Sequence, residues 1–486
     1  MTQVLLVSVY ELGRQPFALA SARAKLEQAG HEVSVIDVSL DELDEQALKS
    51  ATLVAVSVPM HTALRLGLEV IGFVRRTRPG AHICLFGLYA WLYGRELLGG
   101  AADSVIGGEF EPALCELAGR LARRQPVGGI PGLTARGASE LSPPLLERIA
   151  FVPPNRTGLP PLERYARLIG PEPGQTRWVG SLEASRGCKH RCAHCPVVPV
   201  YDGRFFVVPA DVVLADAARQ FSAGARHFSF GDPDFLNGPK HALNVARRLH
   251  AELPEVTFDV TTKIEHVLRE RGQFAELHAL GCLFVVSALE SLSDRVLEAL
   301  DKGHTRSDII EALEVLREAR IALRPSFLPF TPWSTLDDYL ELVDFVFDQN
   351  LVESVDPIQL TIRLLLPPGS ALLASEAADP PAYVSGYVPE ELGYRWQHPE
   401  PLMDELQRQV TDVVEQGRGS NREILLEIRS LAYRAASRSE PSLPVFSAAP
   451  FVPRIDEPWF CCAEPSGELL KHVTGAGRQG SACRPG

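Results

Sequence analysis

The chain has 486 residues, a length that suggests roughly three domains. Apolar residues make up 45% and charged residues 22%, which is typical of a globular protein and excludes disorder as the main state. Acidic residues outnumber basic ones, 61 against 48, and the formal net charge is −13. This balance argues against a broad basic surface for nucleic acid or anionic lipid.

The first residues lack the basic segment of a signal peptide, and no apolar run reaches the roughly 18 residues needed to cross a bilayer. The chain has nine cysteines, and three of them lie between residues 188 and 195. In a reducing compartment such a cluster indicates metal binding or catalysis before disulfides. We therefore expect a cytoplasmic protein with no membrane partner.

Residues 1–125 alternate short β-rich runs with amphipathic stretches, such as 18–29 and 64–76. Five β-α units predict a flavodoxin-like (Rossmann-type) α/β domain with a parallel sheet. The ligands of such a sheet lie at the carboxyl ends of its strands. The expected strands are residues 4–9, 32–37, 53–58, 82–86 and 104–106.

Residues 126–178 are rich in proline, which favours a linker or a wrapping segment. Between residues 179 and 370 the β-α alternation resumes, and it predicts a partial (β/α)6 TIM-like barrel with its chemistry on the loops after the strands. The expected strands are 179–184, 227–230, 256–261, 283–288, 323–328 and 357–364. Residues 371–486 are expected to form a mainly helical and irregular extension, with a helical stretch at 402–436 and a Cys-Cys motif in the tail.

The cysteine cluster lies directly after the first predicted barrel strand, in the segment Ser-Arg-Gly-Cys188-Lys-His-Arg-Cys192-Ala-His-Cys195-Pro. The spacing C-x3-C-x2-C suits three irons of a cubane cluster and leaves the fourth iron open for another ligand. A structural zinc site is the alternative, and it would need His190 or His194 as its fourth ligand. We predict that the three cysteines hold an iron–sulfur cluster.

This loop resembles the signature of the radical S-adenosylmethionine (SAM) superfamily, whose members carry the same spacing after the first strand of a partial barrel. The resemblance implies a [4Fe–4S] cluster whose open iron binds SAM. It also implies reductive cleavage of SAM, with electrons from a partner such as ferredoxin or flavodoxin. His194 stands where the family usually has an aromatic residue near the adenine.

Looser matches to the family follow the later strands. Asp232 and Asp234 stand where the family often has a Gly-Gly-Glu run that binds the SAM ammonium, and the resemblance leaves open which aspartate does so. Ser287 and Glu290 resemble the segment near the SAM ribose, since a carboxylate accepts well from paired hydroxyls. Ser326, on the fifth predicted strand, is a further candidate for SAM binding.

Residues 1–125 resemble the cobalamin-binding domain that precedes the barrel in many radical SAM proteins. Glycines after the strands let a backbone approach a bulky cofactor tail closely. The family's motif for a lower axial histidine has no counterpart at residues 10–15, and a domain that has lost the cofactor is the alternative. The predicted cobalamin contacts are Ser57, Met60, Gly87, Leu88, Gly107, Gly108 and Glu109.

Near the end of the chain, Cys461-Cys462-Ala-Glu-Pro resembles the tail of the CUAEP/CCAEP-tail radical SAM (seleno)proteins. Two neighbouring thiols can bind a thiophilic atom, deliver a hydrogen atom or exchange with a partner. We therefore predict catalytic roles for Cys461 and Cys462. Burial as inert small side chains is the alternative.

Together these features predict a radical SAM enzyme that uses cobalamin for methyl transfer to a small molecule, or for a related radical modification. No nucleic-acid partner is expected. A first alternative is transfer of a SAM-derived group to a thiol-bound soft element such as arsenic. An alternative from another class is a non-catalytic iron–sulfur or zinc-binding protein.

Overall fold

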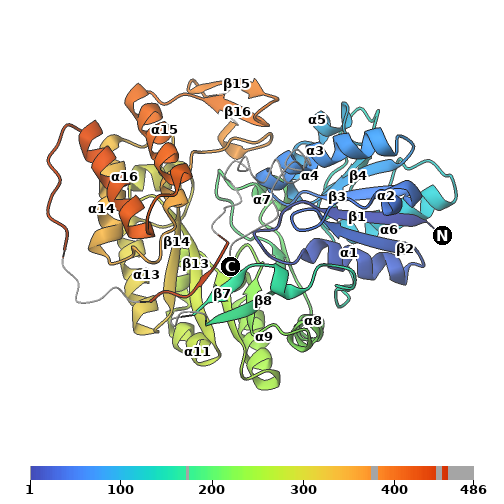
Figure 1. Ribbon diagram of the computed structural model, residues 1–486, viewed down its shortest axis with the longest axis horizontal. Coiled ribbons are helices and arrows are strands. Elements are labelled where there is room, and N and C mark those ends of the chain that lie inside the picture. Colours follow the sequence, from blue (N-terminus) through green and yellow to red (C-terminus); the bar gives the residue numbers. More distant parts are fainter. Residues whose placement is uncertain (1, 171–174, 374–380, 445–450, 458–486) are drawn as a thin grey trace. The chain divides into compact units, whose positions relative to one another are not determined.

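The structure, a computed structural model, describes residues 2–170, 175–373, 381–444 and 451–457. The chain divides into two compact units, with the boundary between Tyr165 and Ala166 (Figure 1). Among the described residues, no helix is both long and apolar enough to span a membrane.

The described strands of the first unit form one sheet in the order β2-β1-β3-β4-β5-β6. Strands β1 to β5 pair in parallel, and β6 adds to β5 in the antiparallel sense. The five parallel strands match the predicted ones to within one residue at each end. The strands are β1 (Gln3–Ser8), β2 (Glu32–Asp37), β3 (Leu53–Ser57), β4 (His82–Phe86), β5 (Ser104–Ile106) and β6 (Leu133–Ala135).

This sheet is buried on both faces because its central strands are apolar at consecutive positions. Val4 and Leu6 of β1 pack into one apolar core, and Leu5 and Val7 on the opposite face are equally buried. Such continuous apolar strands are typical of parallel sheets covered by helices on both sides. The helices are α1 (Phe17–Gln28), α2 (Glu45–Ser50), α3 (His61–Thr77), α4 (Leu88–Leu92), α5 (Gly94–Leu98) and α6 (Phe110–Ala122).

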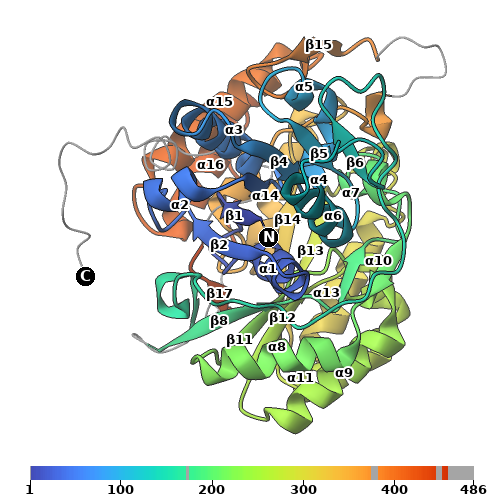
Figure 2. The ribbon, with the colours of Figure 1, turned by 90° about the vertical axis from the view of Figure 1, so that its right-hand side faces the viewer.

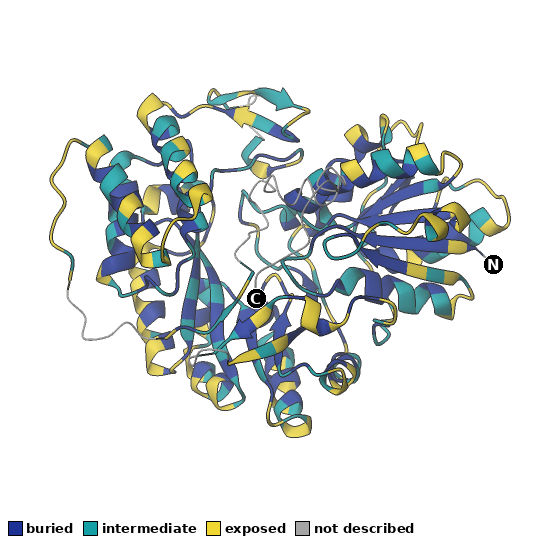
Figure 3. Cartoon of the chain, in the orientation of Figure 1, coloured by how far each residue is buried: buried dark blue, intermediate teal, exposed yellow. Residues whose placement is uncertain are grey.

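The second unit is built on a curved sheet in the order β14-β13-β12-β11-β8-β7-β17. Strands β8 and β11 to β14 pair in parallel, whereas β7 and β17 are antiparallel additions at one edge. Figure 3 shows that the central strands are largely buried. The strands are β7 (Arg167–Ile169), β8 (Thr176–Leu182), β11 (His227–Phe230), β12 (Thr257–Thr261), β13 (Cys282–Glu290), β14 (Ala322–Phe327) and β17 (Arg454–Ile455).

Helices connect these parallel strands, and α8, α9, α11 and α13 lie on one side of the sheet (Figures 1 and 2). The predicted helical stretch at 402–436 is two helices, α15 (Pro401–Gln416) and α16 (Asn421–Ala435), separated by a left-handed Gly417. The other helices are α7 (Val197–Tyr201), α8 (Ala210–Ser222), α9 (Pro239–Glu252), α10 (Ile264–Arg269), α11 (Phe274–Ala279), α12 (Asp294–Ala299), α13 (Arg306–Glu318) and α14 (Leu336–Asp348). The unit also has two small antiparallel sheets. One pairs β9 (Ser185–Gly187) with β10 (Phe205–Val207), and the other pairs β15 (Val384–Val388) with β16 (Gly393–Trp396).

The prediction of a sixth barrel strand at 357–364 is wrong. Residues Pro357–Leu360 form a 3-10 helix, and only an isolated bridge joins Phe330 to Arg363. Pro357 favours the first turn of a helix because its φ is fixed and it has no N–H to donate to a sheet. The side chain of Gln359 then accepts a hydrogen bond from the Phe327 N–H of β14 (2.9 Å), in place of a further strand.

Candidate active site

The cysteine loop begins after β9 and ends at α7, and Asn237 holds its first residues in place. The Asn237 side chain donates to the Gly187 carbonyl and accepts from the Lys189 N–H, both at 3.1 Å. Gly187 has a φ of +76°, and a Cβ there would lie 2.5 Å from the Arg204 carbonyl oxygen, so a larger residue would displace the loop. The thiols of Cys188, Cys192 and Cys195 are free.

Lys263 brings a positive charge to this loop from the segment just after β12. Its ammonium donates to Cys192 Sγ at 3.5 Å and pairs with Glu265 at 2.6 Å. An ammonium beside a sulfur stabilises the thiolate, the form that ligates metals. Lys263 is therefore placed to balance negative charge on Cys192.

Glu290 ends β13 in the left-handed region, with a φ of +63°, next to an irregularity in the β13–β14 register. Its Oε1 accepts hydrogen bonds from His194 Nε2 and Lys302 Nζ, both at 3.1 Å. Burial works to raise the pKa of Glu290, but the Lys302 ammonium and the His194 hydrogen bond outweigh it and hold that pKa well below its usual range. Glu290 is thus a buried carboxylate that stays ionised and joins the cysteine loop to β13.

The two aspartates after β11 have different surroundings. Asp232 accepts hydrogen bonds from the Ala184 N–H (2.9 Å) and from Ser185 Oγ (2.6 Å). Both of its oxygens therefore bond the turn after β11 to the segment after β8. Burial raises the pKa of Asp232 to about 7, although these hydrogen bonds oppose the rise. Asp234 Oδ1 accepts from the Leu236 N–H and from Thr262 Oγ1, which leaves its Oδ2 for another partner.

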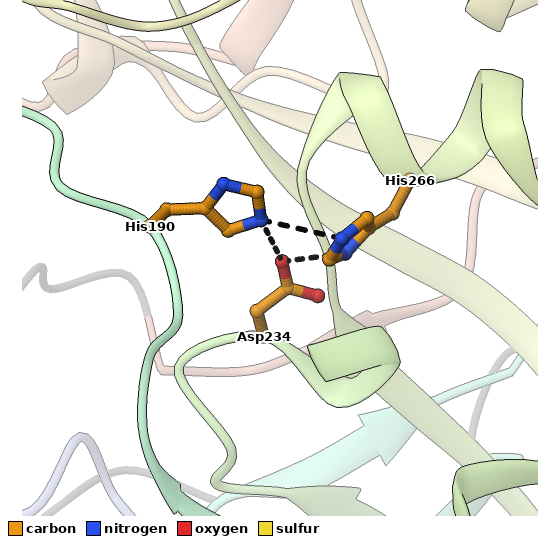
Figure 4. Close-up of side chains that lie close together, drawn as sticks. All are labelled: His190, Asp234 and His266. Atoms are coloured by element: carbon orange, nitrogen blue, oxygen red, sulfur yellow. Dashed lines mark hydrogen bonds and ion pairs between the residues drawn. The ribbon is translucent and has the colours of Figure 1, made fainter. Parts of the chain in front are cut away.

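Asp234 Oδ2 lies beside two imidazoles (Figure 4). His266 Nδ1 is 2.8 Å from it and His190 Nε2 is 3.6 Å from it, while the two Nε2 atoms are 3.2 Å apart. Both histidines of the cysteine loop therefore have other neighbours, His190 at Asp234 and His194 at Glu290. His194 bonds Glu290 through Nε2 only, and its Nδ1 has no hydrogen-bond partner among the described residues, so this contact does not prevent the imidazole from ligating a metal.

Ser287 and Ser326 lie on different faces of the sheet. Ser287 is fully buried on the same face as Val285 and Leu289, and its hydroxyl has no hydrogen-bond partner among the described residues. Ser326 is opposite Ala288 in the β13–β14 register, and both are half-buried. Of the two serines, only Ser326 lies on a partly accessible face.

In the first unit, contacts within the protein explain the three glycines predicted to admit a cofactor. A Cβ at Gly87 would lie 3.0 Å from the Val58 backbone, one at Gly107 would lie 2.3 Å from the Trp91 ring, and one at Gly108 would lie 2.3 Å from the Leu145 carbonyl oxygen. Of the other predicted contacts, Met60 and Leu88 are half-buried and Glu109 is buried.

Ser57 is the predicted cobalamin contact with unused hydrogen-bonding capacity. It is opposite Ser8 in the β1–β3 register, at the carboxyl ends of the two strands. Both hydroxyls are buried and lack a hydrogen-bond partner among the described residues. Cys461 and Cys462 lie outside the described residues.

Three further residues at this site were not predicted: Lys263, His266 and Lys302. The sequence could have indicated Lys263, because it comes shortly after a predicted strand, and barrel active sites lie at the carboxyl ends of the strands. His266 stands at the start of a helix and Lys302 follows one, and sequence alone does not distinguish them from surface residues. Only the packing of the second unit buries them, to 0% and 3% exposure.

Residues 182–346 match a family model, described as the radical SAM superfamily, and this range holds the cysteine loop, Lys263, Glu290 and Lys302. The chain carries a radical SAM domain. Members of this superfamily use a [4Fe–4S] cluster and SAM.

Two curated relatives resemble the chain beyond this domain. An uncharacterised methyltransferase of Pyrococcus horikoshii is 23% identical over 270 residues, which cover 54% of this chain and 56% of the relative. A hopanoid C-3 methylase of Methylococcus capsulatus is 22% identical over 326 residues, which cover 66% of this chain and 62% of the relative. The chain spans less than two thirds of the length of either protein.

Two solved structures share the fold over most of the chain. The radical SAM methyltransferase TsrM from Kitasatospora setae, solved with cobalamin and a [4Fe–4S] cluster, has a TM-score of 0.63 at 19% identity and covers 90% of this chain and 100% of its own. The cobalamin-dependent radical SAM enzyme OxsB, solved with aqua-cobalamin and SAM, has a TM-score of 0.68 at 14% identity and covers 89% of this chain and 72% of its own. At these identities the likeness concerns the fold.

Proposed function

We propose that the chain is a cytoplasmic radical SAM enzyme that uses cobalamin to transfer a methyl group to a small molecule. The observation that carries the proposal is the loop of three free cysteines inside the radical SAM domain, at the carboxyl ends of parallel strands. The relatives named as a methyltransferase and a methylase support the type of reaction.

The donor set fits a cluster with one open iron. Cys188, Cys192 and Cys195 supply three soft ligands, the number that a [4Fe–4S] cluster with one open iron needs. When bound, the [4Fe–4S] cluster supplies the electron that cleaves SAM reductively. The protein's own part is to hold the three thiolates on one loop, whose first residues Asn237 fixes, and to place the Lys263 ammonium beside the thiolate of Cys192.

His194 and Glu290 are the residues we propose to lie along bound SAM, with the imidazole near the adenine and the carboxylate near the ribose. Because Lys302 keeps Glu290 ionised, its lone pairs suit hydroxyl donors. Ser326, on the partly accessible face of β14, is a further candidate contact. Both oxygens of Asp232 accept hydrogen bonds, whereas Oδ2 of Asp234 accepts none among the described residues, so Asp234 is the better candidate for an ammonium contact.

The first unit fits a cobalamin-binding role. Its order β2-β1-β3-β4-β5 is that of flavodoxin-like sheets, which bind ligands at the carboxyl ends of their strands. The unpartnered hydroxyls of Ser8 and Ser57 lie at those ends and would gain partners from a polar cofactor. When bound, cobalamin carries the methyl group.

The first test follows 5′-deoxyadenosine by mass spectrometry, with anaerobically reconstituted protein, SAM and a strong reductant such as reduced flavodoxin. We expect about four irons per chain and a deoxyadenosine product. Both should be lost in Cys192→Ala and retained in Cys84→Ala, whose thiol is buried in the sheet of the first unit. One zinc per chain and no SAM-derived product would contradict the proposal.

Methyl transfer is tested by adding hydroxocobalamin and following S-adenosylhomocysteine, the product of SAM after loss of its methyl group. We expect its formation to depend on cobalamin. If only deoxyadenosine forms, with cobalamin bound and candidate substrates present, methyl transfer would be excluded. The chain would then be a radical SAM enzyme that catalyses another type of reaction. No observation on the described residues favours the arsenic alternative, which depends on the tail cysteines.

A further inference from the structure

His190, Asp234 and His266 form a compact buried group in the second unit (Figure 4). They come from three segments, the cysteine loop, the turn after β11 and the start of α10. The side chains of His266 and Asp234 are 0% and 1% exposed, and that of His190 is 14% exposed. Solvent therefore does not reach the side chains of His266 and Asp234, and it reaches the group only at His190.

Two atoms of this group face each other without a hydrogen bond. Asp234 Oδ2 and His266 Nδ1 are 2.8 Å apart, yet neither has a hydrogen-bond partner among the described residues. The two atoms form an ion-pair contact, but the hydrogen-bonding capacity of both stays unused, which is unfavourable for buried polar atoms. A ligand that both atoms can bind would use this capacity.

Neighbouring groups orient all three side chains. Asp234 Oδ1 is fixed by the Leu236 N–H at 3.1 Å and by Thr262 Oγ1 at 2.9 Å, so Oδ2 is directed at the imidazoles. On the far side of His190, Nδ1 lies 3.5 Å from Glu265 Oε2, so Nε2 is directed at Asp234. Carboxylate–histidine pairs and hydrogen-bonded ligand carboxylates are the usual outer shell of a metal site.

We propose that His190, Asp234 and His266 bind a divalent transition-metal ion of the zinc or ferrous-iron class, separate from the iron–sulfur cluster. Two imidazoles and one carboxylate are ligands that such ions take, with a remaining position open to water or substrate. Bonds of about 2.0–2.1 Å in a tetrahedral arrangement separate ligand atoms by roughly 3.3 Å. With His266 Nδ1 as the ligand atom, Asp234 Oδ2 lies 2.8 Å from it and 3.6 Å from His190 Nε2, on either side of this value. One ligand atom from each of the three residues lies within 4.8 Å of the other two, so small side-chain shifts bring all three to one ion.

The local charges are compatible with a dication. Asp234 supplies one negative charge, and the charges of Lys263 and Glu265 balance each other in an ion pair at 2.6 Å. None of the three cysteines takes part, so the site does not compete with the cluster for ligands and does not depend on the proposed reaction. It does occupy the free oxygen of Asp234, so Asp234 would not be the contact of the SAM ammonium.

The experiment is a metal count on the full chain. Protein with its iron–sulfur cluster reconstituted anaerobically is dialysed against one equivalent of Zn²⁺, and zinc, iron and sulfide are measured together. We use a Cys461→Ser/Cys462→Ser background, so that the tail thiols cannot bind the probe. We expect about one zinc per chain in addition to about four irons.

Two substitutions test the ligands. Asp234→Asn keeps the shape of the side chain and an acceptor for Thr262 and Leu236, and His266→Ala removes one imidazole. We expect at least a tenfold loss of zinc affinity in both, with iron and sulfide unchanged. His278→Ala, which removes an exposed histidine of α11, is the matched control and should retain zinc.

X-ray absorption spectroscopy at the zinc edge, on the wild-type chain, tests the proposal even if a variant does not fold. We expect nitrogen and oxygen neighbours at about 2.0–2.1 Å and no sulfur shell near 2.3 Å. Zinc that binds through sulfur, that stays in both ligand variants, or that does not bind to the cluster-loaded protein would overturn the proposal. In that last case, weaker SAM binding in Asp234→Asn would assign the aspartate to the ammonium instead.

Discussion

At the scale of single residues, the site depends on charges that the fold has buried and paired. Glu290 is 8% and Lys302 3% exposed, and their contact at 3.1 Å offsets part of the desolvation cost that each charge would have alone. Burial works to lower the pKa of Lys302, but Glu290 and then Cys192 raise it above its ordinary value. Both groups therefore remain charged within reach of the cysteine loop.

Substitution of Lys302 by methionine should destabilise the second unit. It leaves the Glu290 carboxylate buried with His194 as its remaining partner, a change that typically costs about 3–5 kcal/mol. The measurement is the free energy of unfolding in urea at pH 7. Arg247→Met, which breaks the exposed Arg247–Glu276 pair, is the control and should change little.

The difference between Lys302→Met and the wild type should also depend on pH. The folded-state pKa of Glu290 is lowered, so its stabilising contribution is present above the unfolded pKa of about 4.3 and is lost as the pH falls towards the folded value. The two proteins should therefore converge in stability below about pH 4. A difference that grows on acidification would contradict the ion pair.

Lys263 should tune the reduction potential of the proposed cluster. A hydrogen bond to a ligating sulfur disperses its negative charge and favours the reduced state. We expect Lys263→Met to shift the potential to a more negative value in a redox titration followed by electron paramagnetic resonance. Lys240→Met, which removes an exposed ammonium at the start of α9, should leave the potential unchanged, and equal potentials in all three proteins would exclude the role.

At the scale of elements, glycines after the strands of the first unit fix how segments cross. Gly108 has a φ of +78° and lies against Leu145, with which it forms a parallel bridge. Gly30, after α1, has a similar φ of +82°, but a Cβ there would meet nothing within 4 Å. The two positions share a positive φ, which only glycine adopts without strain, and they differ in how closely other atoms approach.

Alanine at these two positions should separate strain from crowding. Gly30→Ala introduces only the unfavourable φ, which costs about 1 kcal/mol, whereas Gly108→Ala also forces a Cβ against the Leu145 backbone and should cost roughly 1–3 kcal/mol more. Unfolding in urea measures both. Equal losses would show that Leu145 moves away freely.

The elements also show where sequence reasoning succeeds. The run 82–86 has four consecutive apolar residues after His82 and ends at a glycine, so its strand is predicted to the residue. The segment 357–364 alternates apolar and polar residues as a strand does, but its structure is decided by Pro357 and by the Gln359 side chain, which accepts the Phe327 N–H of β14. That outcome depends on tertiary contacts, as does the burial of His266 and Lys302.

At the scale of the whole molecule, the two proposed cofactors belong to different compact units, cobalamin to the first and the cluster to the second. Each unit has its own sheet and its own apolar core. The loss of one cofactor should therefore not remove the ligands of the other.

This separation predicts the metal content of variants. The full chain reconstituted with iron, sulfide and hydroxocobalamin should hold about four irons and one cobalt. Cys192→Ala should lose the iron and keep the cobalt, and elemental analysis after gel filtration measures both. Loss of cobalt together with iron would show that the first unit does not bind cobalamin independently of the cluster.

One edge of the second sheet has a consequence for how the chain reaches its native state. Strand β7 begins at Arg167, near the start of the second unit. Its outer neighbour is β17 (Arg454–Ile455), which lies near the end of that unit in the sequence. During synthesis, the outer edge of β7 therefore exposes unpaired N–H and C=O groups until this last strand leaves the ribosome. In this interval nascent chains can associate edge to edge, so slower refolding and more aggregation are the expected phenotype of any change that weakens the β7–β17 pair.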